Sequence, residues 1–153
     1  MSANTDTELS QKSESIQVVV FQMGKELFAV SISDVWEIVL MQPITPVPGA
    51  PDFVEGVVNL RGQIIPVINL AKRLGLESRE ETSETRIVVT QVGDETVGMI
   101  VDAVQKVTHI PIDDIEVPNG IALDGEVLAY VQGIAKVDKG LISLIDLEEA
   151  ISL

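Results

Sequence analysis

The sequence predicts an all-β protein made of two copies of one β unit. Segment 17–38 returns without a gap as 86–107, an offset of 69 residues, and segment 56–74 returns as 133–151, an offset of 77 residues. The 153 residues are 46% hydrophobic but only 3% aromatic, so the core must consist of Val, Ile and Leu, whose β-branched members suit a pleated sheet. Repeated units bury their apolar faces against each other, and the seam between them is a place for partners to bind.

The first copy is predicted to begin near residue 16, because segment 1–15 is polar and acidic and reads as a disordered tail. Two β-rich runs at 17–23 and 26–32 flank Gly24-Lys25, and a tight hairpin is expected there. A third strand is expected at 34–40.

Four prolines between residues 43 and 51 exclude regular structure and predict a loop. Strands are expected at 54–60 and 63–68, joined at Arg61-Gly62. Leucines at helical spacing and a terminal Gly75 then predict one short helix over 70–76.

Pro66 cannot donate to a sheet ladder and is therefore expected at an edge or a bulge. The charged run 77–84 carries no apolar residue and is the linker between the copies. In the second copy, 147–153 is the counterpart of the short helix. Because the two offsets differ by eight residues, the extra chain of that copy is expected between Thr108 and Tyr130, with a turn at Pro118-Asn119-Gly120.

Charge and composition exclude several classes of function. A formal net charge of −14 repels nucleic-acid phosphates and anionic lipids alike. The absence of cysteine excludes disulfides and thiolate chemistry and suggests a reducing compartment. No apolar run approaches the roughly 20 residues that span a bilayer, so a soluble, cytoplasmic protein is expected.

The sequence offers no set of residues suited to catalysis. The single histidine, His109, reads as an exposed residue at a strand end. Asp113, Asp114 and Glu116 lack the spacing of a calcium loop and read as a solvated acidic segment. Neither common glycine-rich phosphate-binding motif is present. We therefore expect no enzymatic activity, no metal and no cofactor.

Segment 59–70, Asn-Leu-Arg-Gly-Gln-Ile-Ile-Pro-Val-Ile-Asn-Leu, resembles the signature of the CheW family of chemotaxis coupling proteins. Asn69 stands where that family usually has Asp. Further matching blocks follow the family's order: Glu37-Ile38, Ile44-Thr45 with Pro48, Ala50-Pro51-x-Phe53-Val54-x-Gly56-Val57, Gly98-x-Ile100-Val101-Asp102-x-Val104 and Gly133-Ile134-Ala135-Lys136.

The resemblance implies one CheW-like domain over 16–153, made of two pseudo-symmetric five-stranded SH3-like β-barrels with short helices. Barrel one would span roughly 16–80 and barrel two roughly 84–145, with an exchange of terminal elements left open. It also implies a non-catalytic adaptor, monomeric when isolated, that docks the tips of chemoreceptors to the regulatory domain of the histidine kinase CheA. Such a protein would be cytoplasmic and recruited to receptor arrays at the inner face of the membrane.

Matching motifs assign candidate binding residues to the two partners. Those for receptor contact, expected at the seam, are Val35, Gly56, Arg61, Gly98 and Val104. Those for kinase contact are Trp36, Glu37, Ile38 and Ile44. The valines could equally be core residues, and the glycines could be bulge or close-approach positions. If Val35 points inward, Trp36 is exposed, since neighbouring strand residues face opposite ways.

A surface ion pair is expected between Glu37 and Arg61, near the start of the receptor-facing surface. Glu37 aligns with Lys106 at the first offset, and Arg61 aligns with Asp138 at the second. Both charges are thus reversed in the second copy, which is expected if each copy keeps one ion pair at an equivalent place.

Two other functions remain open from the sequence. The same signature would serve an adaptor of a type IV pilus or another chemosensory-like pathway. A small-molecule-binding double barrel, or an enzyme subunit, would be favoured by a deep closed pocket at the seam.

Overall fold

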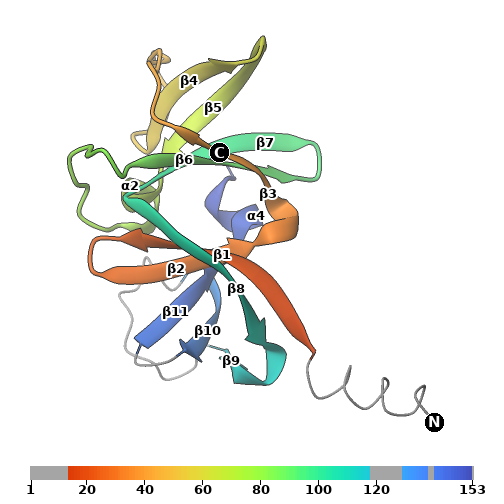
Figure 1. The fold of residues 1–153 in the computed structure, drawn as a ribbon. Coiled ribbons are helices and arrows are strands. Elements are labelled where there is room, and N and C mark those ends of the chain that lie inside the picture. Colours follow the sequence, from red (N-terminus) through yellow and green to blue (C-terminus); the bar gives the residue numbers. More distant parts are fainter. Residues whose placement is uncertain (1–13, 118–128, 138–139, 153) are drawn as a thin grey trace.

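A computed structural model describes residues 14–117, 129–137 and 140–152. These residues form eleven strands and four short helical segments, and the strands lie in two sheets (Figure 1). The all-β prediction is confirmed. The strands are β1 (Ser15–Met23), β2 (Glu26–Ser31), β3 (Val35–Leu40), β4 (Val54–Leu60), β5 (Gln63–Asn69), β6 (Arg86–Val92), β7 (Glu95–Val101), β8 (Ala103–Pro111), β9 (Ile115–Glu116), β10 (Val131–Val137) and β11 (Gly140–Ile145). The helical segments are η1 (Ile32–Asp34), α2 (Leu70–Leu74), η2 (Ile112–Asp114) and α4 (Leu147–Ala150).

The two copies fold alike, element by element. At the first offset β1, β2 and β3 correspond to β6, β7 and β8, and at the second β4, β5 and α2 correspond to β10, β11 and α4. The predicted hairpins at Gly24-Lys25 and Arg61-Gly62 and the predicted break at Gly75 are all present. β1 begins at Ser15, the last residue of the expected tail, and most of that tail and the expected turn at 118–120 lie outside the described residues.

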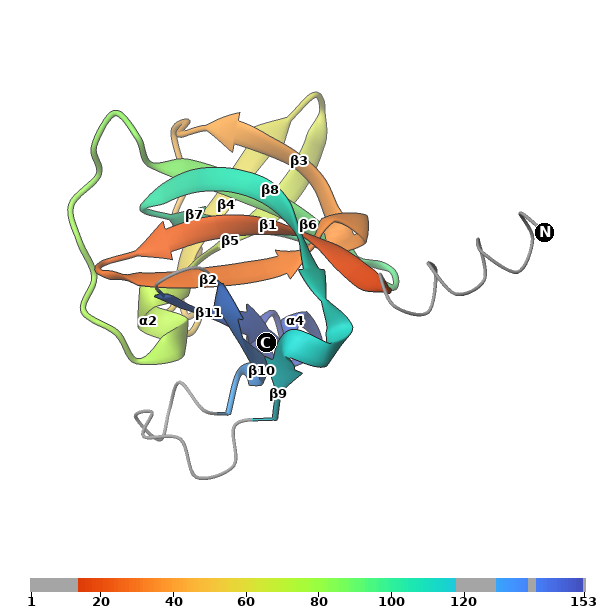
Figure 2. The ribbon, with the colours of Figure 1, turned by 60° about the horizontal axis from the view of Figure 1, so that its bottom comes forward.

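The strands of the two copies are exchanged between the sheets. The five-stranded sheet has the order β3-β6-β7-β5-β4, and the six-stranded sheet has the order β8-β1-β2-β11-β10-β9. The exchange of elements that the sequence left open is thus present, and the barrels do not follow the plain division at 16–80 and 84–145. Instead, one barrel is continuous from β3 to β7, whereas the other joins β1 and β2 to β8 and the strands after it, so that β8 lies beside β1 (Figure 2).

Parallel ladders join the strands of different copies. β5 pairs with β7 in parallel from Val67 opposite Gly98, and β11 pairs with β2 in parallel to Leu144 opposite Ala29. Each hairpin thus closes the barrel of the other copy. The sixth strand, β9, contributes only two paired residues, and an isolated bridge between Thr45 and Val57 takes its place in the other barrel.

Pro66 lies in an interior strand, not at a sheet edge. Its strand, β5, has β4 on one side and β7 on the other. The ladder to β7 covers only Val67 to Asn69, so Pro66 has a paired neighbour on the β4 side alone. The missing backbone donor therefore costs no ladder hydrogen bond on the open side.

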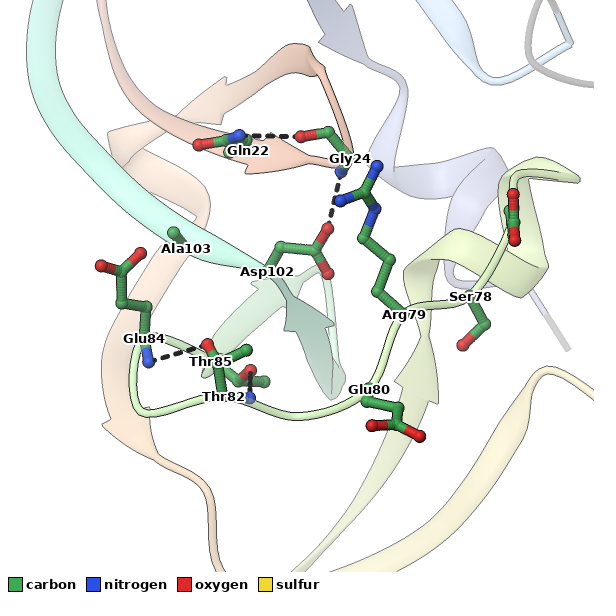
Figure 3. A pocket seen from close by; sticks show the side chains of 11 residues that line it. Gln22, Gly24, Ser78, Arg79, Glu80, Thr82, Glu84, Thr85, Asp102 and Ala103 are labelled. Carbon is green, nitrogen blue, oxygen red and sulfur yellow. Dashed lines mark hydrogen bonds between the residues drawn. The ribbon is translucent and has the colours of Figure 1, made fainter.

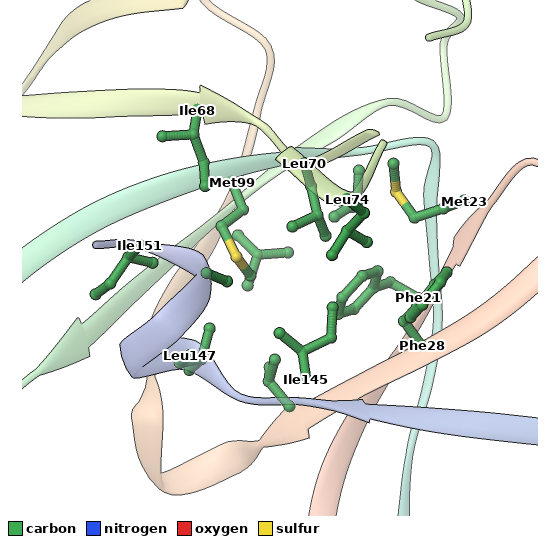
Figure 4. Close-up of a cluster of buried hydrophobic side chains, with 14 of the residues drawn as sticks. Phe21, Met23, Phe28, Ile68, Leu70, Leu74, Met99, Ile145, Leu147 and Ile151 are labelled. Atoms are coloured by element: carbon green, nitrogen blue, oxygen red, sulfur yellow. The ribbon is translucent and has the colours of Figure 1, made fainter. Parts of the chain in front are cut away.

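Three apolar clusters form the core. One fills the six-stranded barrel and includes Val18 and Val20, and one fills the five-stranded barrel and includes Ile87 and Val89. The third and largest lies between the barrels and includes Val88 with the large side chains shown in Figure 4. Alternate residues of a strand point to opposite faces, so β1 and β6 bury one face in a barrel and the other in this central cluster.

The central cluster occupies the seam where the sequence suggested a binding groove. The two short helices cover it, α2 with Leu70 and Leu74 and α4 with Leu147 (Figure 4). Each helix begins at a side-chain cap, because Asn69 accepts from the N–H of Lys72 and Asp146 accepts from that of Glu149. The seam is thus packed, and only its rim is left for a partner.

We expect Ile142→Ala, in the six-stranded barrel, to lower the free energy of unfolding by about 2–5 kcal/mol, because Ile142 is 2% exposed. Since the central cluster joins both barrels, the loss should shift the whole transition. The fluorescence of Trp36, the single tryptophan, reports the unfolding of the other barrel, because Trp36 lies on β3. Its fluorescence midpoint in urea should therefore fall together with the far-UV circular dichroism midpoint.

Leu141→Ala is the matched control, because the neighbouring Leu141 is 50% exposed and should lose little. The barrels would instead unfold independently if the Trp36 fluorescence midpoint of Ile142→Ala stayed at the wild-type urea concentration while circular dichroism showed two separate transitions.

Candidate functional site

The outer face of β3 carries a stripe of exposed apolar side chains. Trp36, Ile38 and Leu40 are 49%, 38% and 65% exposed, and they alternate with half-buried residues along the strand. β3 is one of the two edge strands of its sheet. A register shift at Trp36 marks a bulge between Val35 and Glu37. Exposed apolar patches on an edge strand mark interaction sites or aggregation hazards. We call these three residues the β3 stripe.

The β3 stripe includes two of the four residues predicted for kinase contact, Trp36 and Ile38. Trp36 is exposed while Val35 packs against the central cluster, as the alternation of a strand predicted. Leu40 was missed, although the spacing of Trp36, Ile38 and Leu40 by two residues would have revealed it. Ile44 lies elsewhere, since it packs against the core of the five-stranded barrel.

The ion pair expected between Glu37 and Arg61 is present. The Nη2 of Arg61 lies 2.5 Å from Oε2 of Glu37, and the two side chains are 72% and 21% exposed. It links the turn between β4 and β5 to the edge strand β3. The counterpart in the second copy cannot be compared, because Asp138 lies outside the described residues.

The Arg61-Gly62 turn holds Arg61 in an unusual backbone conformation. Arg61 has φ 53° and Gly62 has φ 85°, as a two-residue hairpin with the twist of its strands requires. Asn59 stabilises the turn, because its Oδ1 accepts from the N–H of Gly62 at 2.8 Å. A left-handed conformation costs a residue with a Cβ about 1–2 kcal/mol. Arg61 is the one non-glycine residue with positive φ in the described part of the chain.

The two glycines predicted for receptor contact are buried in the five-stranded barrel. Gly56 lies opposite Val67, and Val67 lies opposite Gly98 on the next strand, so the glycines flank one valine across the sheet. A Cβ on Gly98 would lie 2.7 Å from the Cγ2 of Ile87, and a Cβ on Gly56, where φ is 147°, would collide with the carbonyl oxygen of Thr45. Both are close-approach glycines that shape the barrel from inside.

Val35 and Val104, the remaining receptor candidates, occupy equivalent places in the two copies. Each is partly buried and packs against the central cluster. They therefore lie at its boundary, where a side chain can support the core and still be reached from outside. The structure does not gather the five receptor candidates into one patch: two form the boundary of the seam, two lie inside a barrel and Arg61 stands on a turn.

A polar cavity of about 490 Å³ lies beneath the linker between the copies (Figure 3). Its acid Asp102 is engaged structurally, because Oδ2 accepts from the N–H of Gly24 at 2.6 Å. The side chain of Gln22 donates to the carbonyl of the same Gly24 at 2.7 Å. Arg79 extends from the linker toward this turn (Figure 3). The cavity thus borders a braced hairpin and is separate from the filled seam.

No catalytic arrangement is evident in the described residues. His109 is exposed on β8, with its Nδ1 3.5 Å from the hydroxyl of Ser15. Residues 14–117, 129–137 and 140–152 contain no group of three His, Cys, Asp or Glu side chains placed to hold a metal ion. No helix within these ranges is long and apolar enough to cross a membrane.

Comparison with known proteins gives consistent matches. A family model described as the CheW-like domain matches residues 17–153. The chain is 35% identical to the chemotaxis protein CheW of Treponema pallidum, over 91% of this chain and 84% of that protein. It is 37% identical to the chemotaxis protein CheW of Bacillus subtilis, over 85% of this chain and 83% of that protein.

A solved structure supports the same assignment of fold. The crystal structure of the scaffolding protein TtCheW from Thermoanaerobacter tengcongensis superposes with a TM-score of 0.83 at 39% sequence identity. The superposition covers 91% of this chain and 94% of that one. The arrangement of two SH3-like barrels is therefore that of this solved structure.

We expect both Gly98→Ala and Gly56→Ala to destabilise the protein, with Gly56→Ala the more severe. The methyl group of Gly98→Ala meets a side chain that can shift, and overpacking of this kind costs about 1–3 kcal/mol. The methyl group of Gly56→Ala meets backbone and also adopts positive φ. Urea denaturation measures both losses.

Gly62→Ala is the control for positive φ alone, since a Cβ there meets nothing within 4 Å. Equal stability of Gly56→Ala and Gly62→Ala would show that the contact with Thr45 is unimportant.

Proposed function

The chain belongs to the CheW family, and from this membership we propose that it is the non-catalytic adaptor that couples chemoreceptors to the histidine kinase CheA. The match of the family model over residues 17–153 carries the proposal. The fold is consistent with it, because the described residues offer exposed binding surfaces and no arranged catalytic groups. The adaptor would act in the cytoplasm, recruited to receptor arrays at the inner face of the membrane.

The β3 stripe is the surface we assign to the kinase. Its large exposed aromatic, Trp36, is the kind of residue that anchors protein interfaces, and Ile38 and Leu40 extend the apolar area along the strand. Glu37 lies between them in the sequence but faces the other side of the strand, where it pairs with Arg61. Ile44 supports this surface from within the barrel, where it packs against the core.

Receptor contact is assigned to the boundary of the seam and to the Arg61 turn. Val35 and Val104 mark that boundary in the two copies. Gly56 and Gly98 would act indirectly, because they allow the close strand packing that sets the shape of the five-stranded barrel. Arg61 would act directly, since its side chain is 72% exposed.

Electrostatics should favour partners with basic surfaces. The chain carries 24 Asp and Glu against 10 Lys and Arg, a net charge of −14. Complementary charge speeds association and is screened by salt. Association with the kinase or receptor should therefore slow as ionic strength rises.

The alternatives are weaker. An adaptor of a type IV pilus or other chemosensory-like pathway would use the same surfaces, and pull-down with that pathway's own kinase would reveal it. A small-molecule-binding double barrel required a deep closed pocket at the seam. The central cluster fills that seam, and the cavity of about 490 Å³ beneath the linker is lined largely by exposed linker residues.

Co-sedimentation with CheA and receptor fragments tests the proposal. We expect Trp36→Asp to weaken kinase binding by roughly thirtyfold, the effect of losing an interface anchor worth about 2 kcal/mol. Its melting temperature should stay near that of the wild type, because Trp36 is 49% exposed. The wild-type chain should raise kinase activity only when receptor is present.

Val117→Asp is the control, because Val117 is also an exposed apolar residue, 70% exposed, but lies in the second copy and away from β3 in the sequence. Equal loss in both variants would move the kinase surface away from β3. Phosphotransfer or hydrolysis by the purified chain alone would overturn the adaptor role.

The Glu37–Arg61 pair should matter for geometry more than for stability. An exposed pair contributes about 0.2–1 kcal/mol, and Arg61→Gly also removes the strain of positive φ. We expect Arg61→Gly to melt near the wild-type temperature while weakening receptor coupling. The exchange Glu37→Arg with Arg61→Glu should restore part of the coupling.

A double-mutant cycle on receptor binding measures this interaction. If the losses of the single variants simply add, the pair has no part in binding.

A further inference from the structure

Arg73, on α2, makes an unusual set of contacts with the end of the chain. Its Nε donates to the carbonyl of Ala150 at 2.9 Å, and its Nη2 donates to the carbonyls of Glu149 at 3.0 Å and Ser152 at 2.6 Å. One guanidinium thus binds three backbone carbonyls between residues 149 and 152, at the end of α4. The rigid planar fork of arginine makes such multiple bonding possible.

The same guanidinium lies between two aromatic rings. Its Cζ is 4.1 Å from the ring centroid of Phe53 and 5.0 Å from that of Tyr130. Both distances are within the range of attraction between a cation and an aromatic face. Phe53 precedes β4, in the five-stranded barrel, and Tyr130 precedes β10, in the six-stranded barrel. Arg73 therefore bridges the two barrels.

The surroundings of Arg73 are symmetric, and Arg73 itself is not. Phe53 and Tyr130 are equivalent at the offset of 77. The backbone carbonyl of Phe53 accepts from the N–H of Asn69, the cap of α2, at 2.7 Å, and that of Tyr130 accepts from the N–H of Asp146, the cap of α4, at 2.8 Å. The equivalent of Arg73 is Ala150, whose carbonyl it binds. A residue that contacts its own counterpart lies at the pseudo-two-fold axis. Only one guanidinium fits there, because a second would repel the first and need the same space.

The two helices end in different ways, and the difference explains the asymmetry. α2 is closed by Gly75 in the left-handed conformation, φ 76°, with the N–H of Leu76 bonded back to Ala71 at 2.8 Å. α4 has no such glycine, and Ile151 follows it with φ −91°. The last carbonyls of a helix need partners from outside. Arg73 supplies them across the axis.

From these contacts we propose that Arg73 is a clasp at the pseudo-two-fold axis. It binds the last carbonyls of α4, which stabilises the end of that helix, and it fixes the angle between the two barrels. The clasp is a conformational device and does not depend on the proposed function. Because the proposed docking surfaces lie on β3 and at the seam, the clasp also sets how these surfaces face each other.

Replacing Arg73 tests the clasp in the full-length chain. We expect Arg73→Met, which keeps the aliphatic stem, to speed hydrogen exchange of the Ile151 amide by about tenfold or more, the effect of losing bonds worth roughly 1.4 kcal/mol. Arg73→Lys keeps the charge but not the fork and should fall between Arg73→Met and the wild type. Lys72→Met is the matched control, because Lys72 is the neighbouring cation and pairs with Glu55 at 3.2 Å on the surface.

The angle between the barrels can be measured separately, because the chain has no cysteine of its own. Spin labels at Gln63→Cys and Lys136→Cys, both exposed and on different barrels, report the distance between them. The distance distribution should broaden in Arg73→Met and stay narrow in Lys72→Met. Wild-type exchange and an unchanged distribution in Arg73→Met would overturn the clasp.

A double-mutant cycle of Arg73→Met with Tyr130→Leu tests the contact between the cation and the aromatic ring. The loss in the double variant should be smaller than the product of the single losses, since both changes remove the same contact. Independent effects would show that the ring of Tyr130 plays no part in the clasp.

Discussion

The fold depends on strands that are buried on both faces. In β1 and β6, successive residues point alternately into a barrel and into the central cluster, so Ile87 and Val88 lie in different cores although they are neighbours. Such strands must be largely apolar, in keeping with a chain that is 46% hydrophobic. Stacking three small cores through shared strands gives each barrel more buried surface than a unit of its size obtains alone.

Because the seam is filled, the recognition surfaces that we propose lie on the outside of the barrels. They are the β3 stripe on an edge strand, the Arg61 turn and the boundary of the central cluster. Gly56 and Gly98 are buried beneath these surfaces and allow the close strand packing that gives the barrel its shape. If the proposed assignment holds, substitutions at Gly56 and at Trp36 would weaken binding for different reasons, one by deforming the barrel and the other by removing a contact.

Much of this arrangement could be predicted from internal repetition. Residue patterns located the strands, hairpins and short helix of the first copy, and the offsets gave their counterparts in the second. The joint sign change of Glu37 and Arg61 with their counterparts predicted the ion pair. The exchange of strands was left open by the sequence and not decided, because a hydrophobic pattern says which face is buried and not which copy covers it. Arg73 was missed for a related reason: its partners are backbone carbonyls, which any sequence provides.

The exchange also determines when each barrel can form during synthesis. The strands of the five-stranded barrel are contiguous, from β3 to β7, so this barrel has all its strands once residue 101 has emerged from the ribosome. β2 must wait for β11, since Leu27 lies opposite Ile142. Chains grow at about 5–20 residues per second, so the apolar first hairpin remains without its final partners for several seconds. The adaptor is thus completed from its middle outward, and its first strands are among the last to be covered.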